Sequence, residues 1–318
     1  MKVFFDTKLM PESIIKDKIK YPDAIFVKDS LTLDNTSQYE SAEIICTNVF
    51  SKISKEILDK LPNLKLIATM TTGFDHIDLE ECKNRNIIVT NVPSYSNESV
   101  AEHALALLFT ISKRIHICNQ EMENCNVNMP ELMGFELKGK TIGLIGTGSI
   151  GLHLARLSKG VGMKVIAFDI KKNEDVAETV GFEYVELNDL FKQSDIISLH
   201  IPLNEHTKYI LNKEQFNIMK QGVVIINTSR GGLINSENLL EALDSGKIDF
   251  AGLDVFEKEK FDCANPDSVS RKLMTHKKVV ATPHSAFNTV EAVNSLFDVT
   301  IKNINLFVDG KDVEDRVN

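Results

Sequence analysis

The sequence lacks several features that would place the protein in particular functional classes. Its 36 Lys and Arg residues are outnumbered by 45 Asp and Glu, and the formal net charge is −9. Binding to nucleic acid or to an anionic membrane requires a basic face, so neither partner is expected. The chain contains no apolar run of 18 residues, and its first residues do not form the apolar segment of a signal peptide. We therefore expect neither a membrane-spanning helix nor secretion.

Cysteine is scarce and scattered. The five cysteines form no C-x-x-C pair and are Cys46, Cys82, Cys118, Cys125 and Cys263. An odd, dispersed set argues against a disulfide framework and against a zinc site, so we expect a cytoplasmic location and no metal. The rest of the composition, 43% hydrophobic and 25% charged, is typical of a soluble globular protein. The length of 318 residues suits two α/β domains.

Two blocks of short apolar runs alternate with helical patterns. The runs of the first block cover residues 3–5, 24–27, 44–46, 64–68 and 87–90. Those of the second block cover residues 141–145, 164–168, 196–199, 223–227, 250–255 and 279–282. A long helical pattern, with Ser99 as candidate N-cap, precedes the second set and continues to Asn124. Strands separated by helices predict parallel βαβ units, and six strands would complete a doubly wound sheet.

The last helical pattern, from Phe287 to Val308, returns to the first block. Its apolar stripe consists of Val290, Val293, Phe297, Ile301, Ile304 and Phe307. The fold predicted is α/β with two doubly wound parallel sheets. A flavodoxin-like substrate domain would span residues 1–98 and be completed by 285–318, and a Rossmann dinucleotide-binding domain would span 99–284. Two crossings of the chain favour a hinge with a cleft between the domains.

The most informative segment runs from the strand at 141–145 to Asp169. The strand leads directly into a loop with the pattern G-x-G-x-x-G, whose glycines are Gly146, Gly148 and Gly151. The first permits a tight turn, the second lets backbone approach a pyrophosphate, and the third lets helix pack on strand. Asp169 ends the next strand and can accept a hydrogen bond from a ribose hydroxyl. A glycine-rich turn without ligand would leave Asp169 unexplained, so the segment predicts a dinucleotide site.

Three strands of the second block end in polar side chains. Arg230 follows the strand at 223–227, Glu257 and Glu259 follow the strand at 250–255, and His284 follows the last strand. In parallel sheets these ends meet at one edge, where ligands bind. Arginine binds carboxylates bidentately, histidine transfers protons near neutral pH, and a neighbouring carboxylate raises the histidine pKa. Each residue alone could be an ordinary surface or loop residue, but together they predict hydride transfer at a carbonyl beside a nicotinamide.

With these residues, the chain resembles the D-isomer-specific 2-hydroxyacid dehydrogenases over nearly its full length. The motifs that carry the resemblance lie at residues 72–78, 91–96, 100–103, 136–141, 146–151, 200–203, 227–231, 254–256 and 282–284. The resemblance implies NAD as cofactor and a small 2-keto acid or D-2-hydroxy acid as substrate, of the D-lactate, glyoxylate or hydroxypyruvate type. Together with the long segment from Ser99 to Pro130, it also implies a homodimer built through the cofactor domain.

The resemblance also assigns roles to residues. The catalytic arginine and histidine correspond to Arg230 and His284, and the catalytic glutamate, five residues after Asp254, to Glu259 rather than Glu257. The implied cofactor contacts beyond the three glycines and Asp169 are Ser149, Ile150, Ile201, Pro202, Thr207, Thr228, Ser229 and Asp254. The implied substrate contacts are the backbone of Thr72, Gly73 and Phe74, which would bind the carboxylate, and the side chains of Tyr95 and Phe287. For these two side chains, packing at a domain interface is the alternative.

The chain departs from the family pattern in three places, and one of them, Met70, leaves the substrate choice open. Met70 replaces an arginine found in many relatives, Lys260 stands where proline is common, and the chain has no tryptophan. A nucleotide-sensing regulator of the same fold, resembling a corepressor, is the non-enzyme alternative, although the acidic charge and the lack of long tails disfavour it. The Asp169 carboxylate would repel a 2′-phosphate, so NAD is expected over NADP despite Lys171 and Lys172 nearby in sequence.

Overall fold

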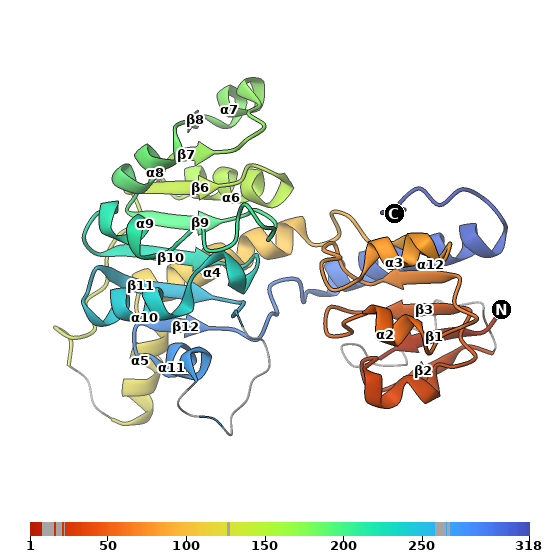
Figure 1. The fold of residues 1–318 in the computed structure, drawn as a ribbon. Helices are drawn as coiled ribbons and strands as arrows, with labels where there is room; N and C mark the ends of the chain where they lie inside the picture. The colour runs from red at the N-terminus through yellow and green to blue at the C-terminus, as the bar shows by residue number, and fades with distance from the viewer. Residues whose placement is uncertain (8–15, 17–20, 22, 126–127, 258–264, 266–267) are drawn as a thin grey trace. The chain divides into compact units, whose positions relative to one another are not determined.

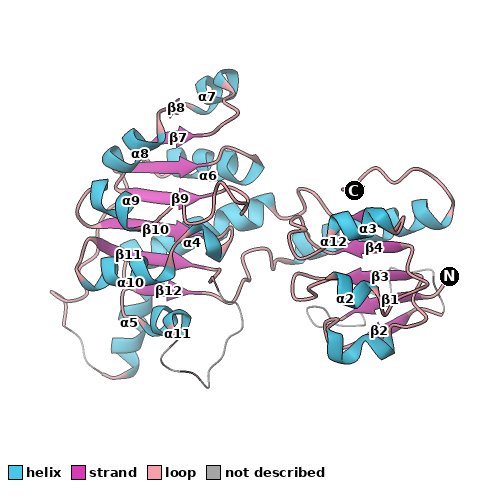
Figure 2. Cartoon of the chain, in the orientation of Figure 1, coloured by secondary structure: helices cyan, strands magenta, loops and turns pink. Residues whose placement is uncertain are grey.

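The computed structural model describes residues 1–7, 16, 21, 23–125, 128–257, 265 and 268–318. The chain divides into two compact units, Met1–Ser96 with Thr289–Asn318, and Asn97–Asn288. Each unit contains one sheet of parallel strands connected by helices (Figures 1 and 2). The predicted divisions, after residues 98 and 284, lie within four residues of these boundaries. In the part of the chain described, no helix is both long and apolar enough to cross a membrane.

The first unit has a five-stranded sheet with the order β2-β1-β3-β4-β5. Its strands are Val3–Asp6 (β1), Ile25–Val27 (β2), Ile44–Thr47 (β3), Leu66–Thr69 (β4) and Ile88–Thr90 (β5). Every residue of β1, β3 and β4 is buried, which is why these strands read as continuous apolar runs. The strand order reverses between β1 and β3, and the flavodoxin-like topology is therefore confirmed.

Among the residues that the structure describes, four helical segments with defined bounds belong to the first unit. They are the 3₁₀ helix η1 (Leu33–Gln38) and the helices α2 (Lys55–Leu58), α3 (Leu79–Asn84) and α12 (Val290–Val308). The last begins at the N-cap Thr289, whose hydroxyl accepts from the amide of Ala292 at 3.3 Å, and it packs on β4. Its predicted stripe is correct at Val293, Phe297 and Ile304, which are buried, but wrong at Val290, which is 74% exposed. Val290 is the first residue of the helix.

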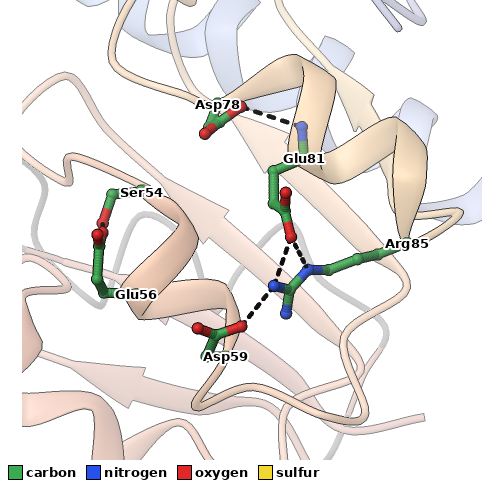
Figure 3. Close-up of polar contacts among 6 residues, drawn as sticks. All are labelled: Ser54, Glu56, Asp59, Asp78, Glu81 and Arg85. Atoms are coloured by element: carbon green, nitrogen blue, oxygen red, sulfur yellow. Dashed lines mark hydrogen bonds and ion pairs between the residues drawn. The ribbon is translucent and has the colours of Figure 1, made fainter.

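An arginine ties α3 to the end of α2 (Figure 3). The Arg85 guanidinium donates to Glu81 Oε1 at 2.6 and 2.9 Å and to Asp59 Oδ1 at 2.5 Å. At the other end of α3, the Asp78 carboxylate caps the helix by accepting from the Glu81 amide at 3.0 Å. The helix that follows the predicted substrate loop is thus held at both ends.

The second unit has a seven-stranded parallel sheet with the order β12-β11-β10-β9-β6-β7-β8. Its strands are Thr141–Ile145 (β6), Lys164–Phe168 (β7), Glu183–Tyr184 (β8), Ile196–Leu199 (β9), Val223–Asn227 (β10), Ile248–Leu253 (β11) and Val279–Ala281 (β12). The order reverses between β6 and β9, which is the doubly wound pattern of a Rossmann sheet. All six predicted strands are confirmed. The strand β8 was not predicted, because two residues, one of them Glu183, give no apolar run.

Helices cover both faces of this sheet. One face packs against α4 (Asn97–Ser112), α6 (Ser149–Gly160) and α7 (Glu174–Val180), and its core includes Leu108, Leu144 and Leu154. The other face packs against α8 (Leu187–Gln193), α9 (Lys213–Ile218), α10 (Ser236–Asp244) and α11 (Val269–Thr275), with the short 3₁₀ helix η2 (Gly231–Leu233) nearby (Figure 1). Two buried faces explain the continuous apolar strands of this unit.

The long helix predicted from Ser99 to Asn124 is wrong in two respects. It starts at Asn97, so Ser99 lies inside the first turn and donates to the Ala286 carbonyl at 2.6 Å instead of capping the helix. It also ends at Ser112, and α5 (Ile115–Glu123) begins after Arg114, which has φ = 51°. The Ser112 carbonyl accepts from the Phe135 amide at 2.8 Å, so a distant segment terminates the helix.

Candidate active site

The glycine-rich loop has the geometry expected of a pyrophosphate site. It connects β6 to the N-terminus of α6, with Gly146 at φ = 100°. A Cβ on Gly146 would lie 2.4 Å from the His200 carbonyl oxygen, and one on Gly151 would lie 2.2 Å from the Gly146 oxygen. Around Gly148, by contrast, a Cβ would meet nothing within 4 Å. The protein's own packing therefore requires glycine at positions 146 and 151. Gly148 instead leaves open space beside a helix N-terminus, and a loop with these properties fits a dinucleotide.

Asp169 lies beside this loop, at the end of β7. Its carboxylate accepts hydrogen bonds from the Thr147 amide at 2.7 Å, the Thr147 hydroxyl at 3.0 Å and the Lys171 amide at 2.8 Å. Burial raises the pKa of Asp169, but the hydrogen bonds from Lys171 and Thr147 outweigh it, and the pKa lies below its ordinary value. Asp169 is therefore an anion at neutral pH, in position to accept from a ribose hydroxyl.

The three strand ends that precede the predicted catalytic residues lie level with one another. In the sheet, Asn227 of β10 is opposite Leu253 of β11, and Leu253 is opposite Ala281 of β12. Arg230 and His284 therefore follow strands separated by one strand, about 10 Å apart at a spacing of roughly 4.8 Å per strand. Asp254 ends the strand between them. The sheet thus brings an arginine, a buried carboxylate and a histidine to the same edge.

Asp254 organises the segment that carries His284. Its carboxylate is 1% exposed and accepts from the Thr282 hydroxyl at 2.5 Å and from the amides of Ser285 and Ala286 at 2.9 and 3.0 Å. Its carbonyl accepts from the His284 amide at 2.8 Å. His284 itself has φ = 54°, a conformation that L-residues seldom adopt and that often marks functional sites. The position of the histidine is thus imposed by bonds to Asp254.

His103, on α4, completes this network, and the sequence analysis assigned it no role. Its Nε2 atom lies 3.0 Å from the Thr282 hydroxyl and 3.6 Å from the Asp254 carboxylate. The only signal in the sequence was that His103 belongs to the motif at residues 100–103, and nothing in its spacing indicated Asp254 as a partner.

Arg230 lies at the start of a tight turn. A guanidinium nitrogen donates to the Ser229 carbonyl at 2.9 Å, and the Arg230 carbonyl accepts from the Asn227 side chain at 3.0 Å. A Cβ on the next residue, Gly231, would lie 2.0 Å from the Phe256 carbonyl carbon. Glycine is therefore the only residue that fits between the ends of β10 and β11. Of the two candidate glutamates, Glu257 accepts a hydrogen bond from the Tyr209 hydroxyl, while Glu259 lies outside the described residues.

The remaining predicted cofactor residues lie along the same edge of the second unit. Thr228 is 8% exposed, and its hydroxyl is buried without a hydrogen-bond partner in the described structure. Ser229 donates from its hydroxyl to the Leu199 carbonyl at 2.6 Å. Thr207 donates to the Pro202 carbonyl at 2.7 Å and so closes the loop that starts at Ile201. Ser149 and Ile150 form the first turn of α6. An orphaned hydroxyl at Thr228 is a polar group for which a ligand could provide the partner.

In the first unit, the loop after β4 leaves successive backbone N–H groups without a protein acceptor in the described chain. Its carbonyls are engaged, because the Thr72 oxygen accepts from the Asn91 side chain at 2.7 Å and the Gly73 oxygen from the Thr71 hydroxyl at 2.6 Å. Within the described chain, the backbone N–H groups of Thr72, Gly73 and Phe74 donate to no protein acceptor. Free N–H groups in succession suit a carboxylate. Tyr95, in this unit, and Phe287, in the other, are both half-buried.

A cavity of about 740 Å³ lies at the opposite edge of the second sheet and is not the cofactor site. It is lined by the first residues of β6, β7 and β8 and by Lys159, Lys164, Lys192 and Lys220. Lys159 and Lys192 lie in the last turns of α6 and α8, where a cation offsets the negative end of the helix dipole. Lys220 forms an ion pair with Asp195 at 2.8 Å. Stabilisation of helix ends accounts for Lys159 and Lys192, and the ion pair accounts for Lys220.

Comparison with known proteins agrees with this geometry. Residues 105–286 match the family described as D-isomer specific 2-hydroxyacid dehydrogenase, NAD binding domain. The D-lactate dehydrogenase of Escherichia coli is 40% identical over 86% of this chain and 86% of its own. The glyoxylate reductase of Thermococcus litoralis is 36% identical over 100% of this chain and 96% of its own.

A solved structure extends the similarity to three dimensions. The D-lactate dehydrogenase from Aquifex aeolicus, in complex with NAD and lactic acid, is 34% identical with a TM-score of 0.89, and the match covers 98% of this chain and 96% of that one. The match includes both units, the glycine-rich loop and the strand ends that carry Arg230 and His284. The chain therefore belongs to the D-isomer-specific 2-hydroxyacid dehydrogenases, which are NAD-dependent oxidoreductases.

Proposed function

We propose that this protein interconverts a small 2-keto acid and its D-2-hydroxy acid, of the D-lactate, glyoxylate or hydroxypyruvate type. The observation that carries the proposal is the edge of the second sheet, where Arg230, Asp254 and His284 follow three adjacent strands with level ends. The relatives named D-lactate dehydrogenase and glyoxylate reductase support this substrate class. NAD, when bound at the glycine-rich loop, exchanges the hydride.

Each side chain then has one task in reduction. His284 donates the proton that the carbonyl oxygen gains as negative charge develops on it. Arg230 binds the substrate carboxylate through its guanidinium fork and stabilises the charge on that oxygen. Glu259 is the carboxylate that the family resemblance pairs with His284. Asp254 holds the backbone of His284 and would lie at the nicotinamide end of a bound cofactor.

We also propose that the free N–H groups of Thr72, Gly73 and Phe74 bind the substrate carboxylate. Tyr95 and Phe287 surround the substrate side chain and set its size. Met70 is 5% exposed and follows β4 directly, so it shapes the base of this loop without reaching solvent.

The test is a steady-state comparison of pyruvate, glyoxylate, hydroxypyruvate and longer 2-keto acids with NADH. A kcat/KM for one of these within the usual enzyme range of about 10⁴ to 10⁸ M⁻¹ s⁻¹ supports the proposal. Chiral analysis of the 2-hydroxy acid formed from pyruvate or hydroxypyruvate should give the D isomer, whereas the product from glyoxylate is achiral. Tight NADH binding without turnover of any acid in the panel would favour the regulator of the same fold instead.

We further propose that two copies of the chain associate through α5 and the residues that follow it. No residue of α5 is buried within the single chain. Four large apolar side chains in this segment are 53 to 71% exposed, and they are Ile115, Met122, Met129 and Met133. Exposed apolar side chains gathered in one segment are typical of an interface between copies.

Sedimentation at micromolar concentration tests the dimer. The double variant Met122→Glu/Met133→Glu should sediment as a monomer, because two charges would be buried at the interface. Val290→Glu is the matched control, since Val290 is 74% exposed in the other unit and should leave the dimer intact. A fully active wild-type monomer would overturn this proposal.

A cytoplasmic location is also proposed. Its support is the cysteine chemistry: Cys46, Cys82, Cys118 and Cys125 are all free thiols, and burial raises the pKa of Cys46 well above its ordinary value. Thiols of this kind suit a reducing compartment. Recovery of the activity with the soluble fraction after gentle lysis would support it, and recovery only with secreted protein would contradict it.

A further inference from the structure

The carboxylate of Asp169 is the last acceptor in a chain of hydrogen bonds that starts outside the glycine-rich loop. The Thr147 hydroxyl lies 3.0 Å from Asp169 Oδ2 and 2.8 Å from the Tyr184 hydroxyl. The Tyr184 hydroxyl in turn accepts from the Asn173 amide at 3.3 Å. Thr147, in the middle of the chain, is 9% exposed, whereas the first bond, from Asn173, lies at the surface.

Counting protons fixes the direction of every bond in this chain. Asp169 has only acceptors when ionised, so the single hydroxyl proton of Thr147 points to the carboxylate. Thr147 must then accept from Tyr184, and Tyr184, having donated its own proton, accepts from the Asn173 amide. The order is therefore Asn173 N–H, Tyr184 O–H, Thr147 O–H, Asp169. Each donor in such a series polarises the next, so the last bond is stronger than an isolated one.

The chain also limits how Asp169 can move. Oδ2 is held by both the amide and the hydroxyl of Thr147, and Oδ1 is held by the Lys171 amide. Donors on both oxygens stabilise the anion and prevent rotation of the carboxylate. The hydrogen bonds outweigh burial, and the Asp169 pKa is lowered.

The two lysines near this carboxylate are poorly arranged to offset its charge. The Lys172 ammonium lies 3.4 Å from Glu186 Oε1, so its charge is already shared with another carboxylate. Lys171 contacts Asp169 through its backbone N–H, and its side chain is exposed. A 2′-phosphate at this position would therefore meet a fixed negative charge.

We propose that Tyr184 and Thr147 are specificity-determining residues, which hold Asp169 as an immobile anion and so exclude the 2′-phosphate of NADP. The proposal rests on the expected preference for NAD and names the residues that enforce it. It also gives a role to β8, which is two residues long and places Tyr184 beside the loop. Without the chain, the carboxylate could turn away from a phosphate and let Lys171 approach it.

The test measures cofactor binding rather than turnover. Dissociation constants for NADH and NADPH are obtained from the fluorescence of the reduced nicotinamide, which can be excited apart from the protein. In Tyr184→Phe, which keeps the ring and removes the hydroxyl, the ratio Kd(NADPH)/Kd(NADH) should fall about 2- to 10-fold, the worth of one hydrogen bond. Thr147→Val should lower the ratio further, because it removes the bond to Asp169 itself.

Two further variants complete the experiment. Tyr21→Phe is the matched control: its hydroxyl donates to Asn305 Oδ1 at 2.6 Å in the first unit, and its removal should leave the ratio unchanged. Asp169→Asn removes the charge itself, and it therefore gives the largest expected fall in the ratio Kd(NADPH)/Kd(NADH). An unchanged ratio in Tyr184→Phe and Thr147→Val, with a lowered ratio in Asp169→Asn, would overturn the proposal. A wild-type ratio near one would instead overturn the preference for NAD.

Discussion

Replacing Asp254 with asparagine should weaken the second unit and slow the reaction together, because the segment bearing His284 folds around this carboxylate. Oδ1 accepts from the Thr282 hydroxyl and the Ser285 amide, and Oδ2 accepts from the Ala286 amide. Asparagine has the same shape, but one of its two positions becomes an NH₂ donor. At least one of the donors in residues 282–286 must then face the NH₂ group of the asparagine instead of an acceptor.

The cost follows from the better of the two amide orientations. With the amide oxygen toward Thr282 and Ser285, only the Ala286 N–H loses its acceptor. A hydrogen bond to a charged group contributes about 1.5–3 kcal/mol, so the free energy of unfolding should fall by about that amount. For a unit of this size, each kcal/mol lowers Tm by roughly 2–4 °C, which gives a fall of about 3–12 °C.

Calorimetry and steady-state kinetics measure the two effects. The calorimetric transition of the second unit should move down, and kcat should fall more than KM rises, since the His284 amide bonds to the Asp254 carbonyl and its backbone would relax. Asp249→Asn is the matched control, because it makes the same change on the same strand, β11, at a half-buried position. If Asp254→Asn has the same Tm as this control and keeps the wild-type kcat, the reasoning is refuted.

Five further predictions concern the same edge of the sheet. His284→Ala should lower kcat roughly 100- to 10,000-fold, which is the range for loss of a general acid. Arg230→Ala should raise KM and lower kcat together. Near-normal turnover in either variant would contradict the role of that residue. Glu259→Gln should move the falling limb of the reduction pH profile to lower pH, and identical profiles would point to Glu257 or another proton donor. Gly231→Ala should give little folded enzyme by calorimetry, because its Cβ would overlap backbone at 2.0 Å. Burial lowers the pKa of His200 from 6.5 to about 4, so the unfolded chain binds a proton at a higher pH than the folded chain does. The free energy of unfolding should therefore be at its full value above pH 6.5 and decrease as the pH falls toward 4. Denaturant titration should show a smaller decrease in His200→Gln.

Local patterns in the sequence predicted most of the fold. Apolar runs in the sequence located eleven of the twelve strands in the two sheets. A strand that is buried on both faces needs a continuous apolar run, and such a run is visible in the sequence. The same rule fails for β8, a two-residue edge strand that begins with Glu183. Periodicity also failed at the end of α4, because the helical pattern continues through Arg114 while a contact from Phe135 ends the helix.

The sequence by itself determined the glycine-rich loop, Asp169 and the strand-end residues Arg230 and His284, because the chemistry of each depends on its own residue type and immediate neighbours. Only the tertiary structure decided what holds these groups. It brought His103 of α4 to Asp254 and Thr282, and it placed Tyr184 against the loop. Hydrogen-bond partners far apart in the chain are set by the packing of helices on a sheet, and no spacing within a single segment carries that information.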